Sequence, residues 1–424
     1  MENIMAERPF PEFYDLLIEN GRLLDPAAGL DETGFLAVDH GRILSAGAAP
    51  PGRPRRRIDA GGRLVCPGLI DMHVHVYEWV TNFGVHADDA GVHAGITTVV
   101  DQGSSGAWTF GGFNAHVIEP SRTDVRAFVS INVAGALMGG MKGDILHNPR
   151  MTDGDGLIKL VERFPGRVKG IKCHCESGAL SHWGTEVLQH ASQVGREADI
   201  PLYVHTGELF PVIEAQRPDA DEVFPSLLPL LKPGDMLAHI YSCMPDGIVG
   251  DSDTVPEAVL QARDRGVHFD IGYGLNFSYR IARMMLAANI LPFTISSDVH
   301  GDFNAFHDNS KLDYSLYGAM TRLWALGMPL ERVIAATTWH PARMLREEDE
   351  IGTLAPGSRA DICIIDIDQT ARDLRDGRGE ILTVERALLP WLTVRAGDPI
   401  VPHRRLLTDL LPGAARVTQQ ERLS

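Results

Sequence analysis

The amino-acid sequence predicts an α/β fold: a (β/α)8 TIM barrel with a small β-sandwich domain formed from both chain ends. In the middle of the chain, apolar runs rich in β-branched residues recur about 25 to 40 residues apart, the length of one strand and its crossover helix. At the two ends, short apolar runs alternate instead with turn residues, which is the pattern of β-hairpins. The expected boundaries are 12–66 and 346–402 for the two parts of the sandwich, 67–345 for the barrel and 403–424 for a surface tail.

The two end segments support the sandwich. Near the N-terminus, the apolar runs 16–18 and 35–38 are each followed by turn residues that include glycine. Near the other end, the turn residues Pro356 and Gly357 precede the apolar stretch 360–366. Patterns of this kind predict half-buried strands, and we expect the strands of both ends to meet in one small domain.

Eight strand-and-helix units support the barrel. Amphipathic stretches such as 186–191 lie between the apolar runs and predict the helices that cover the strands. Eight such units make a barrel of ordinary size. The runs begin near Leu69, Ile96, Arg126, Val168, Pro201, Asp235, Val267 and Pro292.

The composition limits the classes of partner. The 424 residues include 39 Lys and Arg against 56 Asp and Glu, a net charge of −17, which repels nucleic acid and anionic membranes. The one basic cluster, Arg53 to Arg57, is interpreted as a solvated turn because a nucleic-acid surface needs more basic residues around it. The expected partner is a small-molecule substrate, and association into a homo-oligomer stays open.

The predicted location is the cytoplasm. Residues 1–11 lack the apolar segment of a signal peptide, and no uninterrupted apolar stretch is long enough to span a membrane. The cysteines are odd in number and scattered, unlike a disulfide framework. They are Cys66, Cys173, Cys175, Cys243 and Cys363.

The first barrel run carries a His-x-His pair. His73 and His75 are two residues apart, so on a strand both side chains point to the same face. At the end of a barrel strand that face is the interior beneath the mouth, where two imidazoles suit Zn²⁺. Such a pair alone fits packing residues equally well, but the lead-in Pro67-Gly68 and the later polar residues favour a metal site.

Three polar residues end later strands. His205, His239 and Asp298 end the runs that we assign to the fifth, sixth and eighth strands. Barrels of this type hold their active sites at the C-terminal ends of the strands. Any one histidine could be a packing residue, but three polar residues at three strand ends, added to His-x-His, indicate a metal centre.

The fourth strand supplies a lysine. Burial disfavours an ammonium ion, so a lysine that points into a barrel needs a reason. Carbon dioxide can convert its amine to a carbamate, an anionic ligand able to bridge two metals. Lys172 is favoured for this role over Lys169, which lies at the start of the strand and is expected to face solvent.

Taken in chain order, the His-x-His pair, the lysine of the fourth strand and the three polar residues at later strand ends resemble a known family. It is the binuclear, carboxylated-lysine subtype of the amidohydrolase superfamily, and within it the deacetylase and dihydroorotase-like branch. The resemblance covers roughly residues 14 to 400. It is carried by His73-Val74-His75 and by the stretches 91–101, 170–172, 205–208, 296–300 and 351–361.

The resemblance implies a metal-dependent hydrolase that cleaves an amide, cyclic amide or ester bond with a metal-bridging hydroxide. His73 and His75 would hold the buried metal with Asp298, His205 and His239 would hold the outer one, and the carbamate of Lys172 would bridge them. The cofactors would be two divalent metal ions, with zinc favoured, and carbon dioxide on the lysine. Asp298 would also be the catalytic acid–base group, because it can take a proton from the attacking hydroxide and pass it to the leaving group.

Other residues near the strand ends are weaker candidates. For substrate binding these are His300, Tyr241, Tyr273 and Asn276. The stretch Cys173-His174-Cys175 is interpreted as the end of a strand, because a structural zinc site needs about four ligands and no partner pair follows.

Two other functions stay open. In a mononuclear aminohydrolase (deaminase) of a heterocyclic substrate, Glu208, three residues after His205, would shuttle the proton. A non-catalytic, dihydropyrimidinase-like scaffold is the remaining alternative, but such a protein is expected to have lost ligands that this chain keeps.

Overall fold

The computed structural model describes residues 10–137, 145–209, 211–274, 276–302 and 312–411. Their centre is a curled sheet of seven parallel strands with the order β12-β11-β10-β9-β8-β7-β6. The strands are β6 Ile70–Val74, β7 Thr98–Gly106, β8 Asp124–Ser130, β9 Val168–His174, β10 Leu202–His205, β11 Met236–Leu237 and β12 His268–Phe269.

The segment 294–299 closes this sheet. It forms isolated parallel bridges from Thr294 to Asp270, after β12, and from Val299 to Val74, at the end of β6. The eighth strand of the predicted barrel is therefore present as two bridges, because the chain turns away from regular strand geometry where Asp298 adopts a positive φ of 54°. All eight segments begin within two residues of the expected positions.

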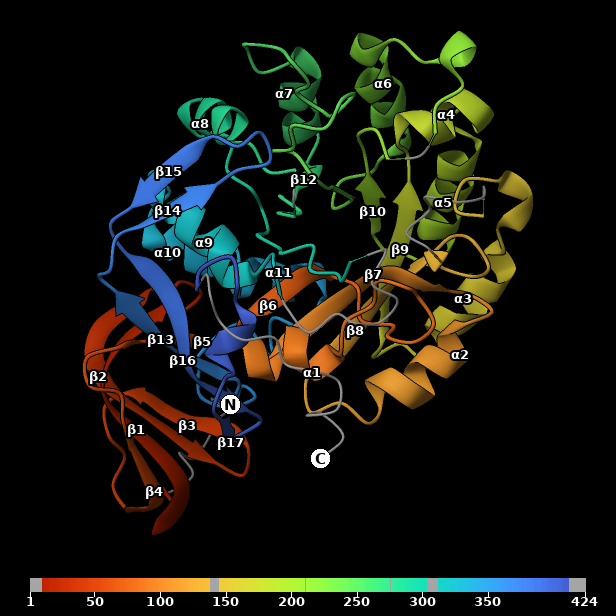
Figure 1. Ribbon diagram of the computed structural model, residues 1–424. Helices are drawn as coiled ribbons and strands as arrows, with labels where there is room; N and C mark the ends of the chain where they lie inside the picture. The colour runs from red at the N-terminus through yellow and green to blue at the C-terminus, as the bar shows by residue number, and fades with distance from the viewer. Residues whose placement is uncertain (1–9, 138–144, 210, 275, 303–311, 412–424) are drawn as a thin grey trace, which may run out of the picture.

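Helices surround the sheet (Figure 1). Their amphipathic sequences explain this placement: on α5, for example, Val187, Leu188, Ala191 and Val194 recur at helical spacing and are buried. The helices are α1 Ala87–Ala90, α2 Phe110–Phe113, α3 Gly154–Arg163, α4 Ser177–Trp183, α5 Glu186–Glu197, α6 Ala220–Leu227, α7 Glu257–Asp264, α8 Tyr279–Ala287, α9 Leu316–Ala325, α10 Leu330–Ala335 and α11 Trp339–Met344.

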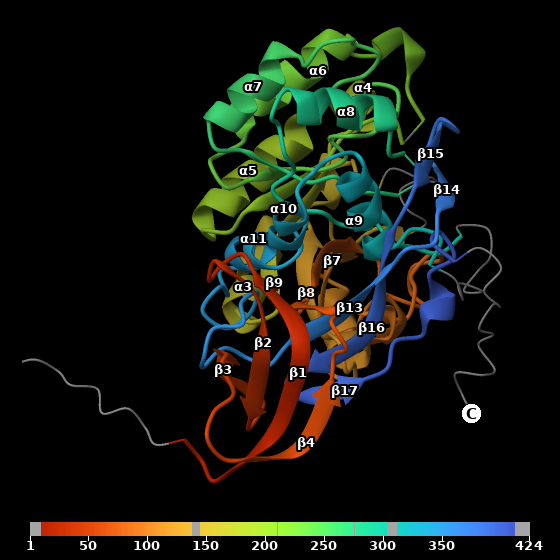
Figure 2. The ribbon, with the colours of Figure 1, turned by 90° about the vertical axis from the view of Figure 1, so that its left-hand side faces the viewer.

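Both chain ends contribute to a second sheet, which lies beside the barrel in both views (Figures 1 and 2). Its order is β17-β16-β13-β5-β1-β2-β3, with β4 paired to β1, so that strands from the two ends meet where β13 pairs with β5. That this domain is a sandwich of two sheets stays a prediction. Its strands are β1 Phe13–Asp25, β2 Leu30–Asp39, β3 Arg42–Gly47, β4 Arg53–Asp59, β5 Leu64–Pro67, β13 Ile362–Asp368, β16 Ala387–Arg395 and β17 Asp398–Ile400.

Two peripheral segments differ from the expectation. The basic cluster Arg53 to Arg57 is not a turn but lies in the edge strand β4, where pairing with β1 extends the backbone and leaves most of the cluster exposed. In the predicted surface tail, Leu406, Leu407 and Leu410 are buried, while 412–424 lie outside the described residues. A separate hairpin consists of β14 Arg372–Arg375 and β15 Ile381–Val384.

None of the helices in the described ranges has the length and apolar character needed to cross a membrane.

Candidate metal centre

The inner part of the site is built by the end of β6 and the segment 294–299. His73 and His75 are 1% and 8% exposed, and their side chains share one face of the chain as the alternation predicts. The Nε2 atoms of His73 and His75 lie 3.2 Å and 3.6 Å from Oδ1 of Asp298. One ligand atom from each of the three residues therefore converges on a single point, as a metal ion requires.

The outer part is built by the ends of β10 and β11. Nδ1 of His205 lies 2.8 Å from Nε2 of His239. Nδ1 of His239 donates to the carbonyl oxygen of Gly272 at 3.0 Å, which leaves the lone pair of Nε2 facing His205. These two nitrogens form the second convergent pair.

Two of the ligand candidates have unusual backbone conformations. His239 and Asp298 adopt φ values of 59° and 54°, in the left-handed region where most side chains are strained. Glycines of the loop after β12 make room for both. A Cβ atom on Gly272 would lie 2.6 Å from Nδ1 of His239, and one on Gly274 would lie 2.9 Å from Oδ2 of Asp298.

Lys172 lies between the two parts. Its side chain is fully buried, and Nζ is 3.4 Å from Nε2 of His73 and 4.7 Å from the centre of the Tyr203 ring. Burial lowers the pKa of Lys172 to about 8 although several carboxylates favour its charged form. Lys169, the competing candidate, is instead held at the other end of the barrel, where Nζ contacts Oε1 of Glu347 at 2.6 Å.

Burial also keeps the histidines neutral. Burial first, and then Lys172 and neighbouring rings, holds the pKa of His73 and of His75 well below its ordinary value. Burial and Lys172 lower the pKa of His239 to about 3. The pKa of Asp298 rises to about 7 because it is buried, despite the attraction of Lys172. Neutral imidazoles and carboxylate oxygens are donors that zinc and similar divalent metals accept, so these side chains fit a pair of such ions.

The side chains that hydrogen-bond to the ligand candidates were not predicted from the sequence. The hydroxyl of Tyr203 donates to Oδ2 of Asp270 at 2.6 Å and therefore accepts from Nδ1 of His73, 3.0 Å away. Nδ1 of His75 contacts the hydroxyl of Ser104 at 3.0 Å. Tyr203 could have been found by alternation, since it precedes His205 by two residues and faces the same way.

A further cluster was also missed. His147, His174 and Glu176 are buried and bring one ligand atom each within 4.8 Å of one another. The interpretation of 173–175 as a strand end is correct, because β9 ends at His174. However, alternation from Lys172 should have directed attention to His174, which shares its face, and not to the cysteines.

The proposed substrate contacts are placed differently. His300 lies at the site, with its ring centre 6.4 Å from that of His75. Tyr241 is fully buried and donates to the carbonyl of Ile290, whereas the Tyr273 ring packs beneath the guanidinium of Arg322. Asn276 accepts a hydrogen bond from the backbone N–H of Cys243 through its own carbonyl oxygen. The structure thus brings only His300 of these four into ring contact with a metal-ligand candidate among the described residues.

Comparisons with known proteins give the family of the chain and its structural relatives. Residues 64–388 match the model of the amidohydrolase family. A deacetylase of Agrobacterium fabrum is 27% identical over 379 residues, which cover 89% of each chain. Among solved structures, an adenine deaminase superposes with a TM-score of 0.80 at 27% identity, covering 92% of this chain and all of the other. A dihydroorotase superposes with a TM-score of 0.76 at 25% identity, covering 91% of this chain and 97% of the other.

Proposed function

The chain belongs to the amidohydrolase family, and we propose that it is a two-metal hydrolase that cleaves an amide, a cyclic amide or an ester. The family and its deacetylase and dihydroorotase relatives indicate a hydrolase that acts on carbon–nitrogen bonds. One observation carries the finer proposal: a buried lysine lies beside His73 in a site with a His-His-Asp group and a second histidine pair. A one-metal site would have no need of that lysine.

In this proposal, His73, His75 and Asp298 hold one ion, His205 and His239 hold the other, and Lys172 serves both. When bound, two zinc-like ions would activate water and polarise the scissile carbonyl group. A carbamate on Lys172 would form when the neutral amine attacks carbon dioxide and releases one proton. The lowered pKa of the lysine, about 8, supports this step because it leaves a substantial neutral fraction near pH 8.

Asp298 is proposed as the acid–base residue. Burial raises the pKa of Asp298 in the metal-free site to about 7, and this carboxylate lies where a positioned side chain can both accept and return a proton. Gly274 leaves room for this side chain, because a Cβ atom there would lie 2.9 Å from Oδ2 of Asp298. Asp298 would take a proton from water and pass it to the leaving nitrogen or oxygen. His300, which lies beside His75, would contact the substrate near this position.

The deacetylase relative sets the order in which substrates are tried. Its alignment spans 89% of both chains, so N-acetyl compounds and acetyl esters come first and cyclic amides such as dihydroorotate second. The similarity to an adenine deaminase supports one alternative, the release of ammonia from a heterocycle. The residue that would shuttle its proton, Glu208, is 3.0 Å from Arg217 with its side chain 33% exposed, which does not favour this role.

The test is metal analysis of the purified protein together with its intact mass with and without bicarbonate. We expect at least two ions per chain, one added carbon dioxide that Lys172→Ala removes, and acetate release from an N-acetyl substrate. Lys169→Ala is the matched control and should retain the added mass. One ion per chain with an unmodified lysine and ammonia release from a heterocycle would overturn the two-metal proposal.

A further inference from the structure

We propose that His147, His174 and Glu176 form a third divalent metal site beside the outer histidine pair. None of the three belongs to the six residues assigned to the binuclear centre. The segment before Pro149 supplies His147, the end of β9 supplies His174, and Glu176 immediately precedes α4. Two segments of the chain, one at His147 and one at 174–176, therefore bring these groups together.

The geometry is that of a small ligand cluster. Oε1 of Glu176 lies 2.6 Å from Nε2 of His147 and 3.4 Å from Nδ1 of His174, and the three atoms lie within 4.8 Å of one another. All three residues are buried, with Glu176 and His147 fully so. Two imidazoles and a carboxylate are a donor set that enzymes use for zinc, with the fourth position left open.

Buried polar atoms of this cluster point to a cation. Within the part of the chain that the structure describes, Nε2 of His174 and Oε2 of Glu176 have no hydrogen-bond partner, and Nδ1 of His174 has only its ion-pair contact with Oε1 of Glu176. A buried polar atom without a partner loses its hydration and receives nothing in return. A divalent ion would take a lone pair from His174 and an oxygen of Glu176, and its charge would compensate the buried carboxylate.

The cluster is adjacent to the binuclear centre but separate from it. The His174 ring stacks on that of His205, with centres 5.2 Å apart and planes inclined by 24°. The His147 ring stands nearly perpendicular to that of His174, with centres 6.1 Å apart. Nδ1 of His205 faces Nε2 of His239 in the outer histidine pair. The third ion would be bound by the other cluster, next to the ring of His174.

The principal competing explanation is a structural hydrogen-bond cluster that ties the segment at His147 to β9. Cobalt reconstitution separates the two. Metal-free protein is loaded with Co²⁺, dialysed and analysed for cobalt per chain. We expect Glu176→Gln to lose one equivalent relative to the natural protein, whereas Glu186→Gln, an exposed carboxylate at the start of α5, loses none. Equal cobalt content in the natural protein and Glu176→Gln would overturn the proposal.

A second measurement keeps the test independent of the binuclear centre and of folding defects. In a His73→Ala/His239→Ala background, one Cu²⁺ per chain should remain, with an electron paramagnetic resonance spectrum that shows coupling to two nitrogens. Adding His174→Asn should reduce the coupling to one nitrogen, with an unchanged circular dichroism spectrum of the metal-free protein. Absence of nitrogen-coupled copper in the background variant would contradict the site. So would a thiolate-to-cobalt charge-transfer band, which would assign the metal to Cys173 and Cys175, whose sulfurs lie 3.7 Å apart.

Discussion

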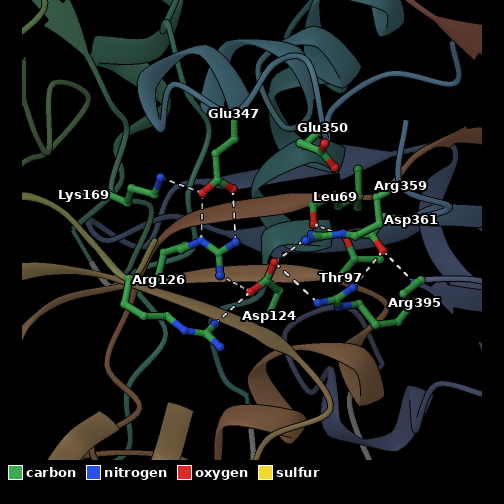
Figure 3. Close-up of polar contacts among 12 residues, drawn as sticks. Leu69, Thr97, Asp124, Arg126, Lys169, Glu347, Glu350, Arg359, Asp361 and Arg395 are labelled. Atoms are coloured by element: carbon green, nitrogen blue, oxygen red, sulfur yellow. Dashed lines mark hydrogen bonds and ion pairs between the residues drawn. The ribbon is translucent and has the colours of Figure 1, made fainter. Parts of the chain in front are cut away.

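Both ends of the barrel bury ionisable side chains, but the surroundings of these charges differ. We call the end at Asp124 the floor and the end with the candidate metal centre the mouth. At the floor, Asp124 begins β8 and is 3% exposed, and four guanidinium groups surround it (Figure 3). Arg359 and Arg395 reach Asp124 from the smaller β domain, at 2.7 Å and 3.5 Å. The other two groups belong to Arg126 and Arg167. Each cation of this cluster thus has an acidic neighbour.

At the mouth, burial outweighs the attraction between opposite charges. Carboxylates that include Asp298 favour the charged form of Lys172, but burial still lowers its pKa to about 8. Asp298, by contrast, has a pKa raised to about 7. The floor pairs its buried charges within the folded chain, whereas burial at the mouth shifts Lys172 and Asp298 toward their neutral forms. The same substitution, Asp to Asn, therefore has different consequences at the two ends.

The largest expected effect is on turnover at the mouth. Asp298→Asn should lower kcat by about 10³-fold or more, because it removes a side chain that is proposed both to bind a metal ion and to act as the acid–base group. Asp124→Asn at the floor is the matched control and should keep kcat per folded molecule within a few-fold. Steady-state kinetics on metal-loaded proteins measure both. Near-native turnover of Asp298→Asn would remove the basis of the assigned role.

The next effect is on stability at the floor. Asp124→Asn leaves four guanidinium groups without their shared carboxylate and should lower the free energy of unfolding by about 3–5 kcal/mol. Urea denaturation monitored by circular dichroism measures this change. The control is Asp253→Asn, whose side chain is 99% exposed and 3.6 Å from Arg280, and which should change stability by less than about 0.5 kcal/mol. Equal losses in the two variants would mean that the network contributes nothing specific.

The floor should also show a defined pH dependence. Burial alone would raise the pKa of Asp124, but Arg126, Arg359 and Arg395 bring it below its ordinary value. A carboxyl group with a depressed folded pKa contributes stability above its unfolded pKa of about 3.9, and this contribution is lost as the pH falls through the folded pKa. The stability difference between the natural protein and Asp124→Asn should therefore be constant from about pH 6 to 7 and shrink below about pH 4. A difference that stays constant to about pH 3 would contradict this assignment.

The contrast between the two ends also explains what could be predicted from sequence. The barrel and the approximate strand starts follow from local patterns, because each strand is an apolar run with its own turn signals. The convergence of His73, His75 and Asp298 follows because parallel strands in a barrel end at the same face. Local patterns thus place the six ligand candidates on the barrel without fixing the distances between them.

Other features depend on contacts between distant parts of the chain. The ion pairs of Arg359 and Arg395 with Asp124 join the smaller β domain to the barrel, and no local sequence pattern predicts them. Tyr241 follows β11 as a pocket residue would, yet its hydroxyl reaches Ile290 and the ring is fully buried. The direction of a side chain beyond a strand end depends on the geometry of the loop. The alternation of side chains within a strand does not predict that direction. His174 lies still within β9, so alternation could have placed it.

The smallest expected effect has the opposite sign and concerns the metal-free protein. A carboxyl group with a raised folded pKa destabilises the fold increasingly as the pH rises from its unfolded pKa, about 3.9, to the folded value, about 7 for Asp298. Asp298→Asn removes this penalty, so at about pH 8 the metal-free variant should be more stable than the metal-free natural protein. At about pH 4 the two should be equal. Thermal unfolding after chelation measures the stability at both pH values. Adding zinc should make the natural protein the more stable of the two, because the variant has an amide in place of the carboxylate that is proposed to bind the ion. A metal-free variant that is less stable at the higher pH would mean that Asp298 is already compensated by Lys172, and that the mouth resembles the floor more closely than their pKa shifts indicate.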